Sequence, residues 1–166
     1  MNLPTREQCL ELLHKNHTPQ NIIEHCEAVS RFAASVADKL QKKSIKVNRQ
    51  LVEAGAMLHD IEKLKPDHEL RGSEFVRDAG YQEAAEIVRT HGLSHLDNSL
   101  FSPKSIEQKL VFYADKRLKQ SALVTVEERF DDLKQRYGKL SEILEKEYAY
   151  VKSIEQELQQ LAGGEL

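Results

Sequence analysis

Imidazole and carboxylate side chains that could bind a metal ion occur at separated points of the chain, each beside apolar residues. His25 lies in the string NIIEHCEAVSRFA, and Asp115 follows the apolar turn LVFYA. Between them, the pair His59-Asp60 follows the run AGAML. One helix supplies at most two or three ligands, so such a site needs several helices to converge. Because a buried carboxylate needs a positive partner, these residues predict a buried metal site that could activate water.

The order of these residues and their local strings resemble the HD-domain metal-dependent phosphohydrolase superfamily, over roughly residues 18–122. The string HDIEK resembles in particular the subgroup named for His-Asp-Ile-Gly, although Glu62 stands where that pattern has glycine. The resemblance implies a compact helical fold and hydrolysis of a phosphate compound with a divalent metal ion. It also implies the ligands of a first ion, which in this sequence are His25, His59, Asp60 and Asp115.

Two further histidines resemble the second metal site of superfamily members that hold two ions. His68 begins the string HELRGS, and His91 ends a predicted helix in the string RTHG. In such members, as in the bacterial family that splits diadenosine tetraphosphate symmetrically, the equivalent histidines bind the second ion, and Asp60 would bridge. Mixed nitrogen and oxygen ligands suit Mn, Fe, Co, Ni or Zn, and oxygen-rich variants suit Mg. The spacing therefore leaves open which metal binds and whether one or two ions are held.

Other residues are candidates to act on the substrate. Asp60 is predicted to be catalytic by orienting the attacking water. Lys63, three residues later on the same predicted helix face, would neutralise phosphate charge, and the superfamily pattern also has lysine there. Lys116 and Arg71 are further candidates for substrate binding, although an ideal helix turns Lys116 about 100° away from Asp115.

Helices must position these side chains, and the sequence predicts an all-α protein, which the resemblance makes an HD-type bundle. Glycine and proline together account for 7 + 4 of the 166 residues, and good helix formers are frequent. Apolar stripes at spacings of three and four cover 22–40 and 51–61, and no convincing strand alternation occurs. Capping patterns and chain breaks predict the remaining helix limits: Thr5 with Gln8, Thr18-Pro19, Asn48, 68–79, 82–91, Ser102-Pro103, and Thr125 with Glu128.

The stretch 123–166 is predicted to extend the core of residues 1–122 with a long amphipathic helix. Apolar residues alternate at spacings of four and three over 133–161, and Glu147 is the one polar residue among them. Such a seam is typical of a coiled coil or an antiparallel helix pair. It is predicted either to fold back on the core, with a bend near Gly138, or to form a homodimer.

Composition excludes several classes of protein and partner. The net charge is −3 and no long basic stretch occurs, so no nucleic-acid footprint is evident. No apolar run approaches the ~20 residues of a membrane span, and the start MNLPTREQCLELL lacks a signal-peptide pattern. We therefore expect a cytoplasmic protein without membrane or nucleic-acid partners, in which Cys9 and Cys26 remain reduced thiols.

The sequence thus predicts a metal-dependent phosphohydrolase that uses metal-activated water on a phosphoester or phosphoanhydride. Its substrate is expected to be small and phosphorylated, of the nucleotide kind, and its identity stays open. One alternative is a symmetrical dinucleoside polyphosphate hydrolase, suggested by His68 and the string RTHG. Others are a non-catalytic module that binds metal and nucleotide, and a purely structural helical adaptor.

Overall fold

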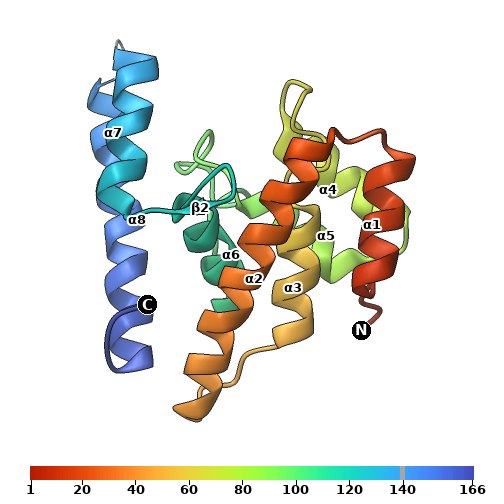
Figure 1. Cartoon of the computed structure of the whole chain (residues 1–166), viewed down its shortest axis with the longest axis horizontal. Coiled ribbons are helices and arrows are strands. Elements are labelled where there is room, and N and C mark those ends of the chain that lie inside the picture. The colour runs from red at the N-terminus through yellow and green to blue at the C-terminus, as the bar shows by residue number, and fades with distance from the viewer. Residues whose placement is uncertain (139–140) are drawn as a thin grey trace.

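The computed structural model describes residues 1–138 and 141–166, and most of these residues are helical (Figure 1). The predicted all-α fold is confirmed, and so is the long C-terminal helix, which has 22 residues. The described elements follow in the order α1 (Arg6–Lys15), α2 (Gln20–Lys42), α3 (Arg49–Leu58), α4 (His68–Asp78), α5 (Gln82–Thr90), α6 (Ile106–Lys116), β1 (Leu118–Lys119), β2 (Ala122–Leu123), α7 (Val126–Tyr137) and α8 (Ser141–Ala162).

Helix α3 is the central element of the core. It packs against α1, α2, α5 and α6, and Figure 1 shows α2 lying along it. All residues of α3 from Leu51 to Leu58 except Glu53 are buried. A Cβ atom added at Gly55 would lie 2.5 Å from Cγ2 of Ile87, so α3 and α5 approach closely at this glycine. The glycine of the AGAML run therefore allows α5 to pack closely against α3.

Three predicted helix caps are confirmed. The side chains of Thr5, Asn48 and Thr125 each accept a hydrogen bond from the backbone three residues later. The predicted start at Thr18-Pro19 is wrong by one residue, because Pro19 occupies the N-cap position of α2 and makes no side-chain cap. The Thr18 hydroxyl donates instead to the Ile61 carbonyl oxygen at 3.3 Å.

The predicted start of α6 at Ser102-Pro103 is also wrong. Ser105 caps this helix, and its capping box with Gln108 satisfies the first backbone N–H groups. The hairpin of β1 and β2 was not predicted, because strands of two residues are too short to show alternation.

Helix α3 ends at Leu58, earlier than its apolar stripe predicts. Residues 59–67 form successive turns, in which the N–H groups of Ile61 and Lys63 bond to the carbonyl oxygens three residues earlier. His59 and Asp60 therefore lie on a tight turn at the end of a buried helix rather than within the helix.

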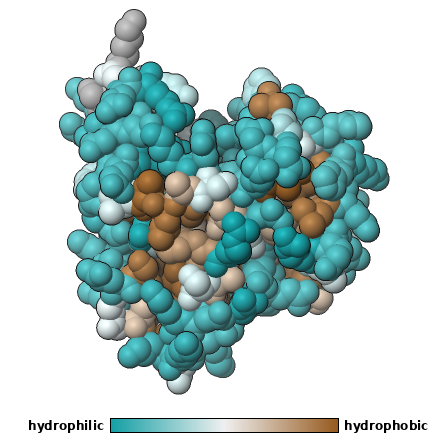
Figure 2. Space-filling model, viewed as in Figure 1, coloured by the Kyte–Doolittle hydropathy of each residue, from teal (hydrophilic) through white to brown (hydrophobic). Residues whose placement is uncertain are grey.

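Helices α7 and α8 form an antiparallel pair at one end of the molecule, and α8 also packs against α6 and α2 (Figure 1). Figure 2 shows a hollow at the upper edge between this pair and the other helices. The seam residues Leu144, Val151 and Leu158 are buried within the chain, and Gly138 follows the end of α7 as its C-cap. Leu140 of the seam lies outside the described residues, and the homodimer and the boundary after residue 122 stay predictions.

Both cysteines are free and buried. Burial raises the pKa of the Cys9 thiol to about 12. Within the two described ranges, no helix combines the length and the apolar character needed to cross a membrane.

Replacing Gly55 with alanine should lower the free energy of unfolding by roughly 1–3 kcal/mol, because the new methyl group overlaps the buried Ile87 side chain. Chemical denaturation measures the change. The matched control is Gly138→Ala, since Gly138 has a helical φ of −52° and no atom of a packed, described residue lies within 4 Å of an added Cβ. The control should keep the wild-type stability; equal stability of both variants would contradict close packing of α3 on α5.

Candidate metal centre

The structure brings all six predicted ligand residues to one place. They come from α2, from the turn after α3, from the first residue of α4, from the end of α5 and from the last turn of α6. The six residues are His25, His59, Asp60, His68, His91 and Asp115.

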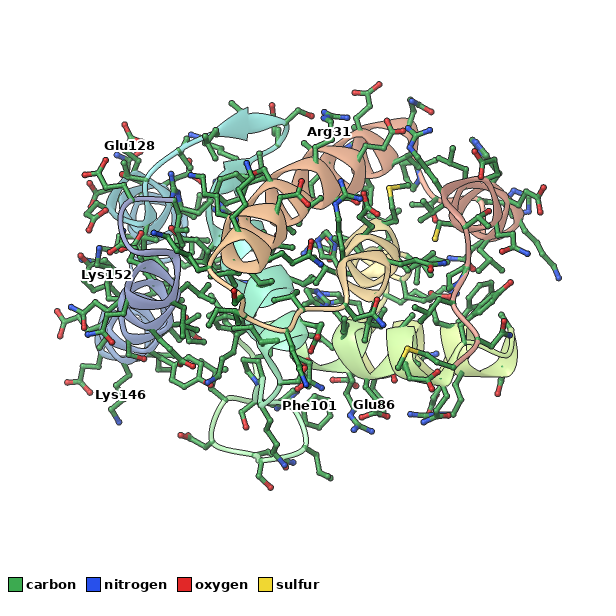
Figure 3. The ribbon with its side chains drawn as sticks, turned by 90° about the horizontal axis from the view of Figure 1, so that it is seen from below. Arg31, Glu86, Phe101, Glu128, Lys146 and Lys152 are labelled. Carbon is green, nitrogen blue, oxygen red and sulfur yellow. The ribbon has the colours of Figure 1, made fainter. Side chains whose placement is uncertain are left out.

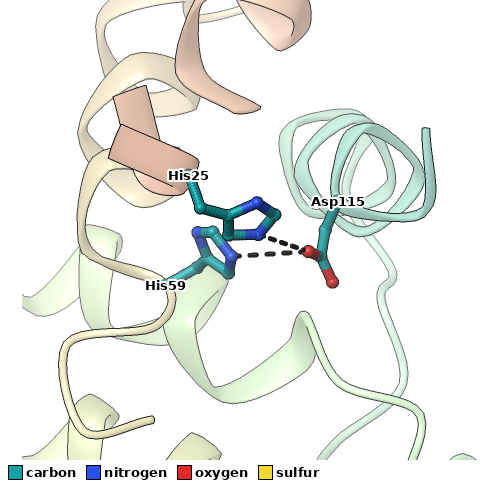
Figure 4. Close-up of side chains that lie close together, drawn as sticks. All are labelled: His25, His59 and Asp115. Carbon is teal, nitrogen blue, oxygen red and sulfur yellow. Dashed lines mark hydrogen bonds and ion pairs between the residues drawn. The ribbon is translucent and has the colours of Figure 1, made fainter. Parts of the chain in front are cut away.

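One half of the centre contains His25, His59 and Asp115, whose potential ligand atoms lie within 4.8 Å of one another (Figure 4). Oδ1 of Asp115 lies 3.0 Å from Nε2 of His25 and 3.5 Å from Nε2 of His59. These three groups can hold one ion.

Asp60 lies between this half and the other histidines. Its Oδ2 atom lies 3.5 Å from Nε2 of His59 and 3.9 Å from Nε2 of His25. Its Oδ1 atom lies 3.2 Å from Nε2 of His91 and 3.6 Å from Nε2 of His68. The two oxygens thus face different pairs of imidazoles, which is the arrangement that a bridging carboxylate requires.

Backbone carbonyls fix the tautomer of three imidazoles. A carbonyl oxygen only accepts hydrogen bonds, so the Nδ1 atom beside it carries the proton, and a neutral ring then has only a lone pair at Nε2. The Nδ1–oxygen distances are 2.6 Å from His25 to Gln120, 2.7 Å from His59 to Ala56 and 2.6 Å from His91 to Val88.

When these rings are neutral, lone pairs of nitrogen and oxygen therefore face one another in the centre. In the part of the chain that the structure describes, the buried Nε2 atoms of His59, His68 and His91 have no hydrogen-bond partner. Buried polar atoms rarely lack one, and a cation placed among them would satisfy nitrogen and oxygen atoms together. The donor set thus fits a divalent ion.

The two carboxylates of the centre are anions. Burial would raise the pKa of Asp60, but a proton on His59, the adjacent His91 imidazole and the charge of Lys63 hold it well below its ordinary value. Burial opposes ionisation of Asp115 in the same way, and Lys116 with the histidines holds its pKa well below the ordinary range.

The histidines differ in how readily they take a proton. Burial lowers the pKa of His91, and burial together with the charge of His91 lowers the pKa of His68 to about 4. Burial would lower the pKa of His59 too, but the Asp60 carboxylate outweighs it and raises that pKa well above the ordinary value. A proton and a metal ion therefore compete for the same nitrogen of His59.

Of the predicted substrate-binding residues, Lys63 lies beside the metal centre and Arg71 does not. Lys63 is half exposed, and its Nζ atom lies 3.2 Å from Oδ1 of Asp60, because the turns after α3 keep residues three apart side by side. Arg71 is exposed at the start of α4, where its Nε donates to the Pro66 carbonyl oxygen at 3.1 Å. Lys63 is thus brought to the centre, while the contact of Arg71 lies outside it.

Lys116 does not point away from Asp115 as an ideal helix predicts. Its long side chain curls back, and Nζ donates to Oδ2 of Asp115 at 2.6 Å and to the His91 carbonyl oxygen at 2.8 Å. Lys116 is buried, with Nζ 4.7 Å from the centre of the Phe112 ring. It therefore links both halves of the centre and leaves Oδ1 of Asp115 free for an ion.

Sequence reasoning missed Glu69, a buried residue whose Oε2 atom lies 3.3 Å from Nδ1 of His68. An acid in the first turn of a helix usually stabilises the helix N-terminus in solvent, so Glu69 gave no signal. The available signal was Gly92, directly after His91: a Cβ there would lie 2.0 Å from Oε1 of Glu69.

Comparison with known protein families matches residues 22–118 to the HD domain. An uncharacterized protein of Methanocaldococcus jannaschii is 27% identical over 147 residues, which cover 80% of this chain and 86% of that protein. No solved structure matches.

Two relatives with named activities are longer than this chain. The dihydroneopterin 2′,3′-cyclic phosphate phosphodiesterase of M. jannaschii is 33% identical over 116 residues, which cover 57% of this chain and 44% of the enzyme. The tRNA (cytidine(56)-2′-O)-methyltransferase of Picrophilus torridus is 27% identical over 181 aligned positions, 99% of this chain and 49% of that protein. The chain thus spans about half or less of the length of each.

Divalent metal should stabilise the protein through Asp60. Adding Mn²⁺ to chelator-treated protein at about 100 times its dissociation constant should add about 2.7 kcal/mol of stability. For a chain of this size, the melting temperature should then rise by roughly 5–10 °C. Asp60→Asn should remove most of this rise, which calorimetry measures.

The control is Asp78→Asn, which removes an exposed carboxylate at the end of α4 and should keep the full rise. A rise of the same size in the Asp60→Asn variant would mean that Mn²⁺ binds elsewhere.

Proposed function

Because the chain belongs to the HD domain family, we propose that it is a metal-dependent phosphohydrolase that cleaves a phosphodiester of a small, nucleotide-like compound. The observation that carries the proposal is the pair of buried, ionised carboxylates facing the bare Nε2 atoms of histidines. Carboxylate oxygens and imidazole nitrogens together are a set of atoms that binds cations. A structural adaptor would need no such cluster.

The ligand roles follow from the two halves of the centre. His25, His59, Asp60 and Asp115 would hold one ion, and His68 and His91 would hold a second with Asp60 as the bridge. When bound, such ions lower the pKa of water towards ~7 and offset the charge that develops on the phosphoryl oxygens.

The remaining groups act around these ligands. The carbonyls that hold the Nδ1–H groups keep each imidazole in its orientation, and Lys116 holds Asp115 and the His91 backbone together. Asp60, held as an anion, would orient the attacking water. Lys63 faces both Asp60 and solvent, so its ammonium group would contact a phosphoryl oxygen of a substrate that enters from outside.

A phosphodiester is favoured over the other substrate classes by the relative that acts on dihydroneopterin 2′,3′-cyclic phosphate. We therefore place a cyclic phosphodiester first. A symmetrical dinucleoside polyphosphate hydrolase is the second candidate, since His68 and His91 lie on either side of Oδ1 of Asp60. A tRNA substrate is not favoured, because the chain spans about half of the methyltransferase relative and has a net charge of −3.

The protein with added Mn²⁺, Ni²⁺ or Co²⁺ should hydrolyse bis-p-nitrophenyl phosphate and nucleoside 2′,3′-cyclic phosphates. His59→Ala and Asp60→Ala should each lower kcat/KM by roughly 1000-fold or more, because each removes a metal ligand. Lys63→Ala should lower it by roughly 10- to 100-fold, and Lys63→Arg should lower it less, because the positive charge remains. Absorbance at the p-nitrophenolate maximum measures the rates.

His17→Ala changes an exposed residue and should leave the rate unchanged. Undiminished turnover in both ligand variants would refute the mechanism. Two ADP molecules as the products from diadenosine tetraphosphate, with no cleavage of cyclic phosphates, would favour the second candidate instead.

A further inference from the structure

A cavity of about 480 Å³ lies between the loop after α5 and the first half of α8. The loop contributes Ser94, His95 and Leu96 to its wall, and α8 contributes Glu147 and Tyr150. Figure 3 shows this loop beside α8, with Phe101 of the loop and Lys146 of α8 labelled. The volume falls in the range of small-molecule sites, roughly 300–1000 Å³.

The wall of the cavity is continuous with elements of the metal centre. Leu93, in this wall, follows His91 by two residues. Tyr150, also in the wall, packs on Phe112, and the centre of the Phe112 ring lies 4.7 Å from Nζ of Lys116, which binds Asp115 and the His91 carbonyl. A molecule whose phosphate lies at the centre can therefore extend its other end into this cavity.

Glu147 is a carboxylate for which the described residues provide no partner. It interrupts the apolar seam of α8, whose neighbouring members Leu144 and Val151 are buried. Among the residues that the structure describes, no hydrogen bond or ion pair to its side chain is found. Burial raises the pKa of Glu147, although Lys116 opposes the shift. An apolar side chain at this position of the seam would pack against the core. The carboxylate that stands there instead has two oxygen atoms that can accept hydrogen bonds from a ligand.

The rings of the cavity wall suit a flat ligand. Tyr150 packs edge to face on the buried Phe112, with ring centres 5.6 Å apart and an angle of 86°. His95 lies against Phe101, with ring centres 5.0 Å apart. Aromatic and imidazole rings stack on planar heterocycles, and a carboxylate accepts two adjacent N–H groups at once.

We propose that this cavity binds the heterocycle of the substrate and that Glu147 selects rings with two adjacent N–H donors. A 2-amino-4-oxo pyrimidine edge, as in guanine, presents such a pair, whereas adenine presents a ring acceptor beside its amino group. The cleavage that would follow binding rests on the proposed function. The binding itself can be tested without turnover.

The test compares the affinity of the Mn²⁺-treated protein for guanosine 2′-phosphate and adenosine 2′-phosphate, which contain no phosphodiester to cleave. Calorimetry should show a preference of roughly 10-fold or more for the guanosine compound, because adenine has an acceptor in place of the ring N–H and loses one of the two hydrogen bonds to the charged carboxylate. Glu147→Gln should abolish the preference, because an amide accepts at only one of its two terminal atoms. Thermal denaturation verifies that the variant is folded.

Glu145→Gln is the matched control, since it removes an exposed carboxylate from the same turn of α8 and should keep the preference. Equal affinities for the two compounds, or a preference that survives Glu147→Gln, would overturn the proposal. Hydrolysis of bis-p-nitrophenyl phosphate should be unchanged in the control variant Glu145→Gln. A preference without any hydrolysis would support the cavity and refute the phosphohydrolase.

Discussion

The structure depends on two buried carboxylates that face the Nε2 atoms of the surrounding imidazoles. Asp60 and Asp115 lie at 3.0–3.6 Å from Nε2 atoms of the surrounding histidines, apart from one longer contact of 3.9 Å to His25. Bringing these groups together without a cation places lone pairs against lone pairs in a low-dielectric interior, which is costly. Part of the stability of this fold is therefore tied to what the centre binds, and a proton on His59 is the competitor of the metal.

The ends of helices supply the fixed geometry around these carboxylates. The last carbonyl groups of a helix have no partner within it, and here the histidine just beyond the end of the helix uses one. His59 follows α3 and donates to Ala56, and His91 follows α5 and donates to Val88. Early termination of α3 at Leu58 thus frees carbonyls and turns the next residues towards the centre. The close approach of α3 and α5 then brings both histidines to the same carboxylate.

Much of this centre could be predicted from the sequence, because ligand residues are constrained in type and in order along the chain. The six ligand positions and the all-α fold are of this kind. The misplaced features depend on contacts between distant segments: the Thr18 hydroxyl bonds to Ile61 from 43 residues away. The inward turn of Lys116 depends on a carbonyl 25 residues earlier. Neither periodicity nor capping preference contains that information, and the buried Glu69 resembles an ordinary first-turn acid.

The C-terminal helices supply none of the proposed ligands, and α8 lines the cavity beside the centre instead. The proposed ligands lie on α2, α4 and α6, in the turn after α3 and at the end of α5, whereas α8 contributes Glu147 and Tyr150 to the adjoining cavity. A carboxylate at an inward position of the seam weakens the packing of α8 on the core, since an apolar side chain there would bury more surface. The heterocycle that the substrate presents to Glu147 would offset that loss in the bound state. The proposed chemistry and the proposed selectivity are thereby divided between the two parts of the chain, so a change in α8 is expected to alter which compound is bound while the proposed ligand set stays the same.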